Sequence, residues 1–168
     1  AQYANKTADE HVVFWADKSV PDSWIKFRDI TQYWLAKGVD GFRYDMAEMV
    51  PVAFWSYLNS HIKHINPDAF LLAEVYDPSK YREYITLGKM DFLYDKVGFY
   101  DSLKGVMQGH LPASVITKAH SEVADIEQHM LHFLENHDEQ RIASPQFVGS
   151  SELGKPALVV SALISRAP

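Results

Sequence analysis

The sequence reads Gly41-Phe42-Arg43-Tyr44-Asp45 directly after a predicted amphipathic helix, and this stretch decides the fold. Two later stretches share its form, an apolar run that ends in acidic residues: Leu72-Ala73-Glu74-Val75 and Phe133-Leu134-Glu135-Asn136-His137-Asp138. In a barrel of alternating strands and helices, the loops after the strands open on one face, where an active site is assembled. We therefore expect the carboxylates of these stretches to be directed toward one shared pocket.

Side chains alternate between the two faces of a strand, so Arg43 and Asp45 are expected on one face and Phe42 and Tyr44 on the other. An arginine two residues before an aspartate can hold that carboxylate ionised through charge-assisted hydrogen bonds. From the residues alone, Asp45 could equally be a helix N-cap or a loop ion pair.

The flanking segments predict strands that alternate with helices. The first helix is expected to begin at Pro21 with Asp22 or Ser23 as its cap, and Gly38 suits its end. Residues 12–15 (Val-Val-Phe-Trp) are interpreted as a short strand or a packed loop. Strands are expected over 39–45, 69–74, 91–95 and 130–134, and further helices over 51–65, around 79–85, in two parts within 99–126 and over 155–165. This order predicts right-handed βαβ units and an α/β class.

Length and charge narrow the class of protein further. The 168 residues are enough for one ordinary domain with a sizeable core. A net charge of -6 argues against nucleic-acid binding. No run approaches the roughly 18 apolar residues of a membrane span. Cysteine is absent, which excludes thiolate metal sites but identifies no compartment.

The three quoted stretches resemble three consecutive signature regions of the alpha-amylase family, glycoside hydrolase family 13, in the right order and at suitable spacings. The resemblance implies a partial (β/α)8 TIM barrel, comprising about strands four to seven with their helices. Because such a barrel takes about 250 residues, the 168 residues are interpreted as a piece of a larger protein, one incomplete catalytic barrel domain over 1–168 without an internal boundary. The resemblance also implies a retaining glycosidase that acts on α-1,4-glucans (starch, maltodextrin) through a covalent glycosyl-enzyme intermediate. The isolated piece is expected to be inactive, because its pocket and strand edges would be open.

The resemblance also implies roles for individual residues. Asp45 would be the nucleophile, Glu74 the general acid/base and Asp138 the carboxylate that stabilises the transition state. Glu74 closes an apolar run and should therefore be partly desolvated. The implied substrate contacts are Arg43, His137, Glu48, Met49 and Tyr76.

Glu48 and Met49 depart from the family pattern, because many members carry lysine and histidine at these positions. We expect both residues to line the leaving-group side of the cleft. In those members the carbonyl of the histidine often joins a calcium site. Because Met49 stands at that position here, no cofactor is predicted for this chain, and calcium remains open for the full-length parent. The pairs His61/His64 and His129/His132 lack further patterned ligands, so no metal site is predicted there.

The signature regions do not separate hydrolysis from transfer, because water and sugar acceptors compete for the same intermediate. A glucan transferase, a cyclomaltodextrinase or neopullulanase and an oligo-α-glucosidase therefore stay open beside an alpha-amylase. An alternative of another class is a non-catalytic carbohydrate-binding relative, although such relatives typically lose the carboxylates that this chain keeps.

Overall fold

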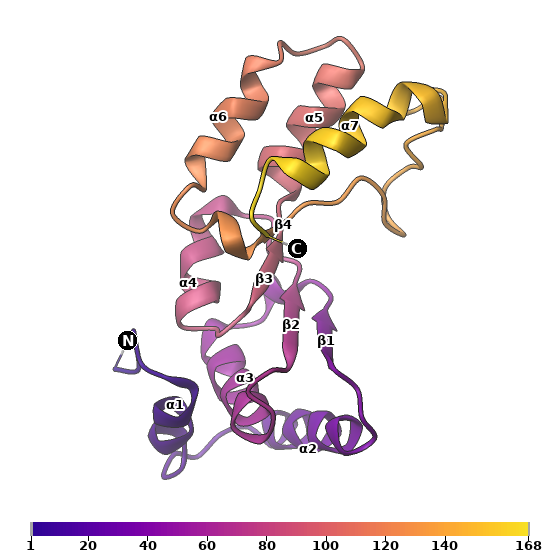
Figure 1. Ribbon diagram of the computed structural model, residues 1–168. Helices are drawn as coiled ribbons and strands as arrows, with labels where there is room; N and C mark the ends of the chain where they lie inside the picture. The colour runs from indigo at the N-terminus through magenta and orange to yellow at the C-terminus, as the bar shows by residue number, and fades with distance from the viewer. Residues whose placement is uncertain (1, 168) are drawn as a thin grey trace. The chain divides into compact units, whose positions relative to one another are not determined.

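The computed structural model describes residues 2–167, and the chain divides into two compact units, residues 1–93 and 94–168. Each strand is followed by one or more helices (Figure 1). The first unit contains α1 (Ala8–Trp15), α2 (Asp22–Ala36), β1 (Gly41–Tyr44), the 3-10 helix η1 (Ala47–Met49), α3 (Val52–Ile65), β2 (Phe70–Ala73), the 3-10 helix η2 (Pro78–Lys80) and α4 (Tyr81–Thr86). β3 (Phe92–Tyr94) spans the boundary.

The strands form one parallel sheet in the order β1-β2-β3-β4. Gly41 to Tyr44 pair in register with Phe70 to Ala73, and Leu72 and Ala73 pair with Phe92 and Leu93. Parallel neighbours joined through helices confirm the predicted α/β class. Each strand is shorter than the pattern predicted, and the run 130–134 contributes only Met130 and Leu131 as β4.

Gly41 opens β1 at a position where the two strands approach closely. A Cβ built on Gly41 would lie 1.9 Å from the carbonyl oxygen of Phe70, which is main chain and cannot move aside without breaking the pairing. Only glycine fits such a contact. The glycine that starts the quoted stretch therefore allows β1 and β2 to pair.

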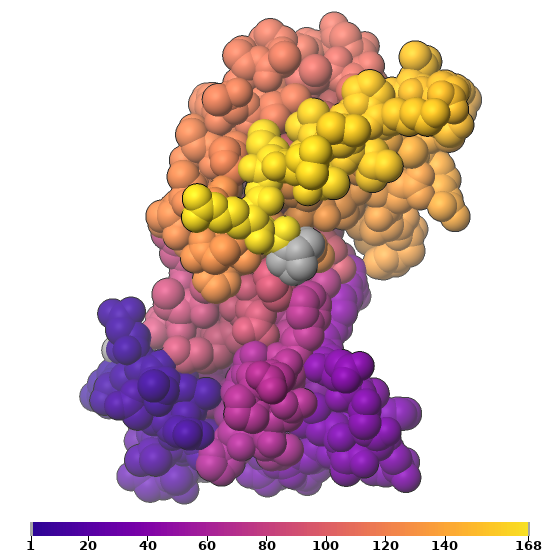
Figure 2. All heavy atoms as spheres, in the orientation of Figure 1, coloured from indigo at the N-terminus to yellow at the C-terminus, as the bar shows by residue number. Residues whose placement is uncertain are grey.

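The core of the first unit lies around α3, which packs against α1 and α2. Figure 2 shows the indigo side chains of α1 directly against the later part of this unit. The buried apolar side chains of the core include Phe54, Trp55, Tyr57, Leu58, Ile62, Leu71, Leu72, Tyr81, Tyr84 and Leu93. Trp34 on α2 is 49% exposed, whereas Trp55 on α3 is only 4% exposed. Among residues 2–167, no helix is both long and apolar enough to cross a membrane.

The interpretation of residues 12–15 as a strand or packed loop is wrong, because they form the end of helix α1. A run of four apolar residues has no readable period of its own. The deciding signal lies upstream in a capping box: the Thr7 hydroxyl accepts from the N–H of Glu10, and the Glu10 carboxylate accepts from the N–H of Thr7. This pairing fixes the helix start.

Two further helix starts differ from the prediction. At α2 neither Asp22 nor Ser23 is the cap; Pro21 holds the N-cap position and no side chain caps the helix. The end was predicted correctly, since Gly38 adopts φ +91° just after the helix. The last helix, α7 (Ser151–Leu163), begins four residues earlier than expected because the Ser150 hydroxyl accepts from the N–H of Leu153.

The second unit contains a π-helical turn (Lys96–Tyr100), α5 (Asp101–Met107), α6 (Ser114–Glu122), the 3-10 helix η4 (Glu127–His129), β4 (Met130–Leu131) and α7. Its core is built on Phe99, Leu103 and Ala157. The His132 ring stacks on Phe99 with centroids 3.7 Å apart, and its Nε2 lies 3.8 Å from the buried carboxylate of Asp95. Burial raises the pKa of Asp95 and lowers the pKa of His132.

A buried histidine in α1 predicts that stability depends on pH. His11 is fully buried, and its Nδ1 lies 2.8 Å from the Ser56 hydroxyl, which also accepts from the indole of Trp15. Burial lowers the pKa of His11 below its ordinary value of about 6.5. The unfolded chain then takes up a proton that the folded chain does not, so the contribution of His11 is complete above about pH 6.5 and decreases as pH falls through that value toward the folded pKa.

Urea unfolding of the protein at pH 7.5, 6.5 and 5.5 should therefore show a falling free energy of unfolding, and His11→Gln should flatten part of that fall. His61 should still contribute to the pH dependence in this variant, because burial lowers its pKa as well. Ser56→Ala is the control: it removes the partner of the ring but not the titrating group, so it should lower stability and keep the pH dependence. An unchanged pH dependence in His11→Gln would contradict the assignment.

Candidate active site

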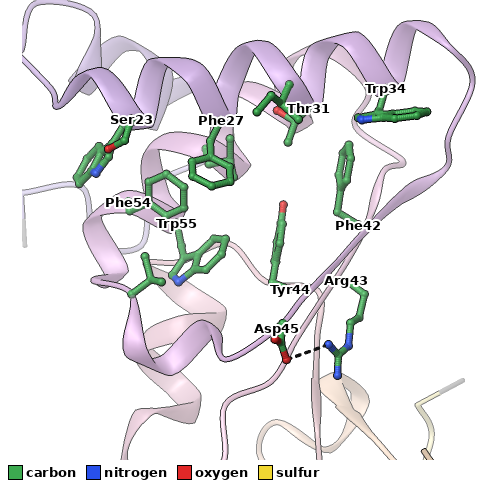
Figure 3. Close-up of a pocket in the computed structure, with 14 residues that line it drawn as sticks. Ser23, Phe27, Thr31, Trp34, Phe42, Arg43, Tyr44, Asp45, Phe54 and Trp55 are labelled. Carbon is green, nitrogen blue, oxygen red and sulfur yellow. Dashed lines mark hydrogen bonds and ion pairs between the residues drawn. The ribbon is translucent and has the colours of Figure 1, made fainter. Parts of the chain in front are cut away.

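The carboxyl end of β1 separates two groups of side chains, as alternation predicts. Figure 3 shows Phe42 and Tyr44 pointing toward α2, while Arg43 and Asp45 lie together on the other side of the strand. These residues line an apolar cavity of about 540 Å³, with Arg43 and Asp45 at its edge. The cavity is bounded by α2, α3 and β1, with Phe27, Trp34 and Trp55 in its lining. The strand therefore directs Phe42 and Tyr44 into the apolar space and leaves Arg43 and Asp45 at its edge.

Tyr44 anchors the apolar face of β1 to α3. Its hydroxyl donates to Oδ1 of Asn59 at 2.8 Å, and Nδ2 of Asn59 donates to the carbonyl of Gly88 at 2.7 Å. Burial raises the pKa of Tyr44, so the phenol stays neutral and remains a donor. Asn59 is fully buried, and this network holds the strand that carries Arg43 and Asp45.

Arg43 joins the two carboxylates that the sequence singled out on neighbouring strands. Its Nη1 lies 3.3 Å from Oδ1 of Asp45, and its Nη2 donates to Oε1 of Glu74. The Asp45 side chain is 70% exposed, whereas the Glu74 side chain is only 5% exposed. The predicted contact between Arg43 and Asp45 is confirmed, and the contact with Glu74 was not foreseen. One guanidinium thus holds an accessible and a buried carboxylate close together.

Glu74 is buried but has hydrogen-bond partners at both oxygens. The N–H of Met46 donates to Oε2 at 3.0 Å, and the Tyr76 hydroxyl donates to Oε1 at 3.2 Å, the oxygen that also accepts from Arg43. The main-chain N–H of Glu74 donates to the carbonyl of Tyr44 at 3.0 Å. A buried carboxylate is costly unless it is paired and hydrogen-bonded, and these contacts meet that requirement.

Met46 makes a contact with Glu74 that the sequence analysis did not foresee. It adopts the left-handed conformation with φ +46°, which is uncommon for a residue with a side chain. This turn directs its N–H toward Glu74. The contact uses the main chain, so no property of a methionine side chain could have revealed it.

Glu48 and Met49 lie in η1, directly after Asp45 and Met46. Oε2 of Glu48 accepts from the N–H of Asp77 at 3.0 Å, in the loop after β2. Met49 is 71% exposed. Whether either residue lines the leaving-group side of the cleft stays a prediction.

The third acidic stretch lies in the second unit. Oδ1 of Asn136 accepts from the N–H groups of Asp138 and Glu139 at 2.9 and 2.7 Å, which fixes a tight turn. Nε2 of His137 lies 3.4 Å from Oδ2 of Asp138, and both side chains are about two-thirds exposed (65% and 63%). Arg141 pairs with Glu135 at 2.8 Å, as expected for a surface arginine. The roles of His137 and Asp138 stay predictions.

The histidine pairs have protein partners. The rings of His61, His64 and His132 contact the carbonyl of Tyr57, the carboxylate of Asp9 and the carbonyl of Ser161, at 2.6, 2.8 and 3.0 Å. Within residues 2–167, no three His, Cys, Asp or Glu side chains are grouped to hold a metal. The expectation that the chain carries no cofactor, with calcium open for the parent, stays a prediction.

Parallel strands alternating with helices, with carboxylates at the carboxyl ends of neighbouring strands, define part of a (β/α)8 barrel with an acidic site. Over residues 8–164 the chain matches the family described as "Alpha amylase, catalytic domain". The chain belongs to the alpha-amylase family.

Curated relatives support the same family. The chain is 30% identical over 86 residues to Alpha-amylase 3 of Dictyoglomus thermophilum, covering 45% of this chain and 17% of that protein. It is 31% identical over 74 residues to an alpha-1,4-glucan:maltose-1-phosphate maltosyltransferase of Cereibacter sphaeroides. This match covers 44% of this chain and 12% of that protein. Over 48 residues it is 38% identical to Neopullulanase 2 of Thermoactinomyces vulgaris, a match that covers 29% of this chain and 8% of that protein. The match thus spans less than a fifth of each of these relatives.

Solved structures confirm the fold. The Nostoc punctiforme debranching enzyme superposes with a TM-score of 0.69 at 21% identity, covering 84% of this chain and 33% of that chain. The ligand-free cyclic alpha-maltosyl-(1→6)-maltose hydrolase of Arthrobacter globiformis superposes with a TM-score of 0.68 at 24% identity, covering 80% of this chain and 31% of that chain. The predicted partial (β/α)8 TIM barrel of the α/β class is therefore confirmed.

Proposed function

We propose that residues 1–168 belong to one catalytic barrel domain of a retaining glycoside hydrolase that acts on α-1,4-glucans. In the first step a carboxylate oxygen of Asp45 attacks the anomeric carbon, and Glu74 donates its proton to the departing glycosidic oxygen. In the second step Glu74 takes a proton from water, the water oxygen attacks the same carbon, and Asp45 is released.

The observation that carries this proposal is the shared guanidinium of Arg43, which bonds to Asp45 at 3.3 Å and also to Glu74. Retaining enzymes need two carboxyl groups about 5–5.5 Å apart, whereas inverting enzymes leave about 6.5–9.5 Å for a water molecule. Two carboxylates bonded to one guanidinium fit the shorter range. The difference in exposure fits the roles, because the exposed Asp45 can reach the sugar ring, whereas the buried Glu74 is held in place beside it by Arg43 and the N–H of Met46.

The remaining assignments rest on sequence motifs and local contacts. Asp138 and His137 are proposed to bond the sugar hydroxyls as the ring flattens toward the transition state, on the strength of the Asn136–Asp138 motif. Tyr76 is proposed to contact the sugar beside Glu74, because its hydroxyl already lies 3.2 Å from that carboxylate. Met49, largely exposed and adaptable, is proposed as an apolar contact on the leaving-group side.

Transfer to a sugar acceptor is the second candidate within the family. A maltosyltransferase and a neopullulanase are among the relatives that this chain resembles, and both activities could use the same glycosyl-enzyme chemistry. A non-catalytic carbohydrate-binding protein is less well supported, because Asp45 and Glu74 are both present and share Arg43.

Proton NMR of the complete protein acting on maltodextrin tests the proposal. The first product signal should be the α anomer, with the β anomer appearing only later by mutarotation, because two displacements restore the configuration. Adding a malto-oligosaccharide acceptor and following chain lengths measures transfer against hydrolysis. Initial release of the β anomer would contradict retention, and no cleavage or transfer on starch, cyclodextrin or pullulan would favour a binding protein.

A further inference from the structure

Glu48 makes contacts that its predicted role as a sugar ligand does not explain. Its carboxylate Oε2 accepts from the main-chain N–H of Asp77 at 3.0 Å, and its own N–H donates to the carbonyl of Glu74 at 3.3 Å. Its carbonyl accepts from the Tyr84 hydroxyl at 3.2 Å and from Nζ of Lys80 at 3.4 Å. The N–H, the carbonyl and the carboxylate of Glu48 therefore all bond to the segment 74–84.

This segment contains the loop that follows Glu74. Asp77 is the N-cap of η2, where its Oδ1 accepts from the N–H of Ser79 at 3.0 Å and from the Ser79 hydroxyl at 2.7 Å. Tyr76 lies between Glu74 and this cap, and its hydroxyl donates to Glu74. A contact that fixes the Asp77 main chain therefore also fixes the position from which Tyr76 reaches Glu74.

The loop after β1 thus holds Glu74 from two directions. The N–H of Met46 donates to the Glu74 carboxylate, and the N–H of Glu48 donates to the Glu74 carbonyl. The Glu48 carboxylate adds the side-chain link to Asp77, and hydrogen bonds to an ionised acceptor are among the stronger ones. A general acid must lie within hydrogen-bond reach of the oxygen it protonates, and small displacements of catalytic groups have large effects on rate.

We propose that Glu48 is a positioning residue for Glu74: it ties the loop after β1 to the loop after β2 and so sets the placement of Tyr76 and the acid/base carboxylate. The inference rests on the proposed function, since it assumes that Glu74 acts as the acid. It assigns the Glu48 carboxylate a protein partner in place of the sugar contact expected from the sequence.

The test compares two substrates in the complete protein. One is an unactivated maltooligosaccharide, and the other is an aryl α-glycoside of the same sugar. The leaving group of the aryl glycoside is a strongly acidic phenol, which departs without being protonated. Glu48→Ala should lower kcat for the maltooligosaccharide by about 10- to 100-fold, in line with a misplaced catalytic group. With the aryl glycoside, the rate of the initial burst of phenol, which reports the first step alone, should fall less than about threefold, because a strongly acidic phenol leaves without a proton from Glu74. Glu48→Gln keeps an acceptor of the same length and should restore most of the activity.

Three controls keep the inference falsifiable. Thermal unfolding reports whether Glu48→Ala folds, and if it does not, Glu48→Met removes the acceptor and keeps the length. Glu83→Gln removes a carboxylate charge from the exposed side of α4, outside these loops, and should behave like the wild type. Glu74→Gln is measured in parallel: if it leaves maltooligosaccharide turnover intact, the proposed function fails, and if it abolishes turnover while Glu48→Ala remains as active as the wild type, only the positioning role fails.

Other outcomes would also overturn the positioning role. A rise in KM or a change in product length at unchanged kcat would make Glu48 a sugar contact. An equal loss in kcat for the maltooligosaccharide and in the phenol burst rate for the aryl glycoside would make its effect a general structural one.

Discussion

Asp45→Asn is expected to lower kcat for α-glucans on the order of 10⁴-fold or more in the complete protein, with little change in the free energy of unfolding. The amide keeps the shape of the carboxylate but cannot form the ester to the anomeric carbon. Asp45 is largely exposed, so its replacement removes little packing. Initial rates on maltodextrin together with urea unfolding measure the two effects separately.

A matched control for Asp45→Asn exists at the other end of the strand. Asp40 is exposed, and its described contact uses the main-chain carbonyl, which accepts from the N–H of Phe70 at 2.9 Å. Asp40→Asn removes the same charge and should keep nearly full activity. If both variants lost activity equally, the loss would come from the strand or its charge, and Asp45 would not be the nucleophile.

Glu74→Gln is expected to lower kcat for unactivated glucans by about 10²–10⁴-fold, the usual contribution of a general acid and base. With an aryl glycoside whose leaving group needs no proton, the first step should persist and the second should become limiting, because water lacks its base. Added azide, a nucleophile that needs no base, should then raise the rate and yield a glycosyl azide. These measurements separate the two tasks of one residue.

Glu83→Gln serves as the control for Glu74→Gln. Glu83 lies exposed in α4, and its replacement by glutamine removes the same charge. It should retain wild-type kinetics with both substrates. If azide neither raised the rate of Glu74→Gln nor appeared in a product, the assignment of Glu74 as the base would be wrong.

The fold was predictable where local patterns are strong. The stripe on α2, proline at the start of α3 and the apolar run of β2 each gave a correct element, because a period of 3.6 or an unbroken apolar run is visible without tertiary context. Residues 12–15 were too short a run to show a period, and the capping box that begins α1 lies outside it. At β4 only two residues pair, because pairing depends on the neighbouring strand and is invisible in the run itself.

The candidate site was predictable in its residue types but not in its connections. Alternation along the strand placed Arg43 and Asp45 on one face, and the structure confirms their contact. The bond from Arg43 to Glu74 needed the register of β1 against β2, which no local pattern contains. The contact of Met46 with Glu74 and that of Glu48 with Asp77 were missed because each depends on a main-chain N–H, that of Met46 in a left-handed turn and that of Asp77 in the loop after β2.

The most direct test of the account is to identify the residue that becomes glycosylated. The complete protein is incubated with an activated fluorosugar whose covalent adduct hydrolyses slowly, digested with a protease and analysed by tandem mass spectrometry. The account predicts one added sugar, on the peptide containing residues 41–45 and located at Asp45, and no adduct in Asp45→Asn. An adduct on Glu74, or full turnover of the probe without any covalent adduct, would contradict it.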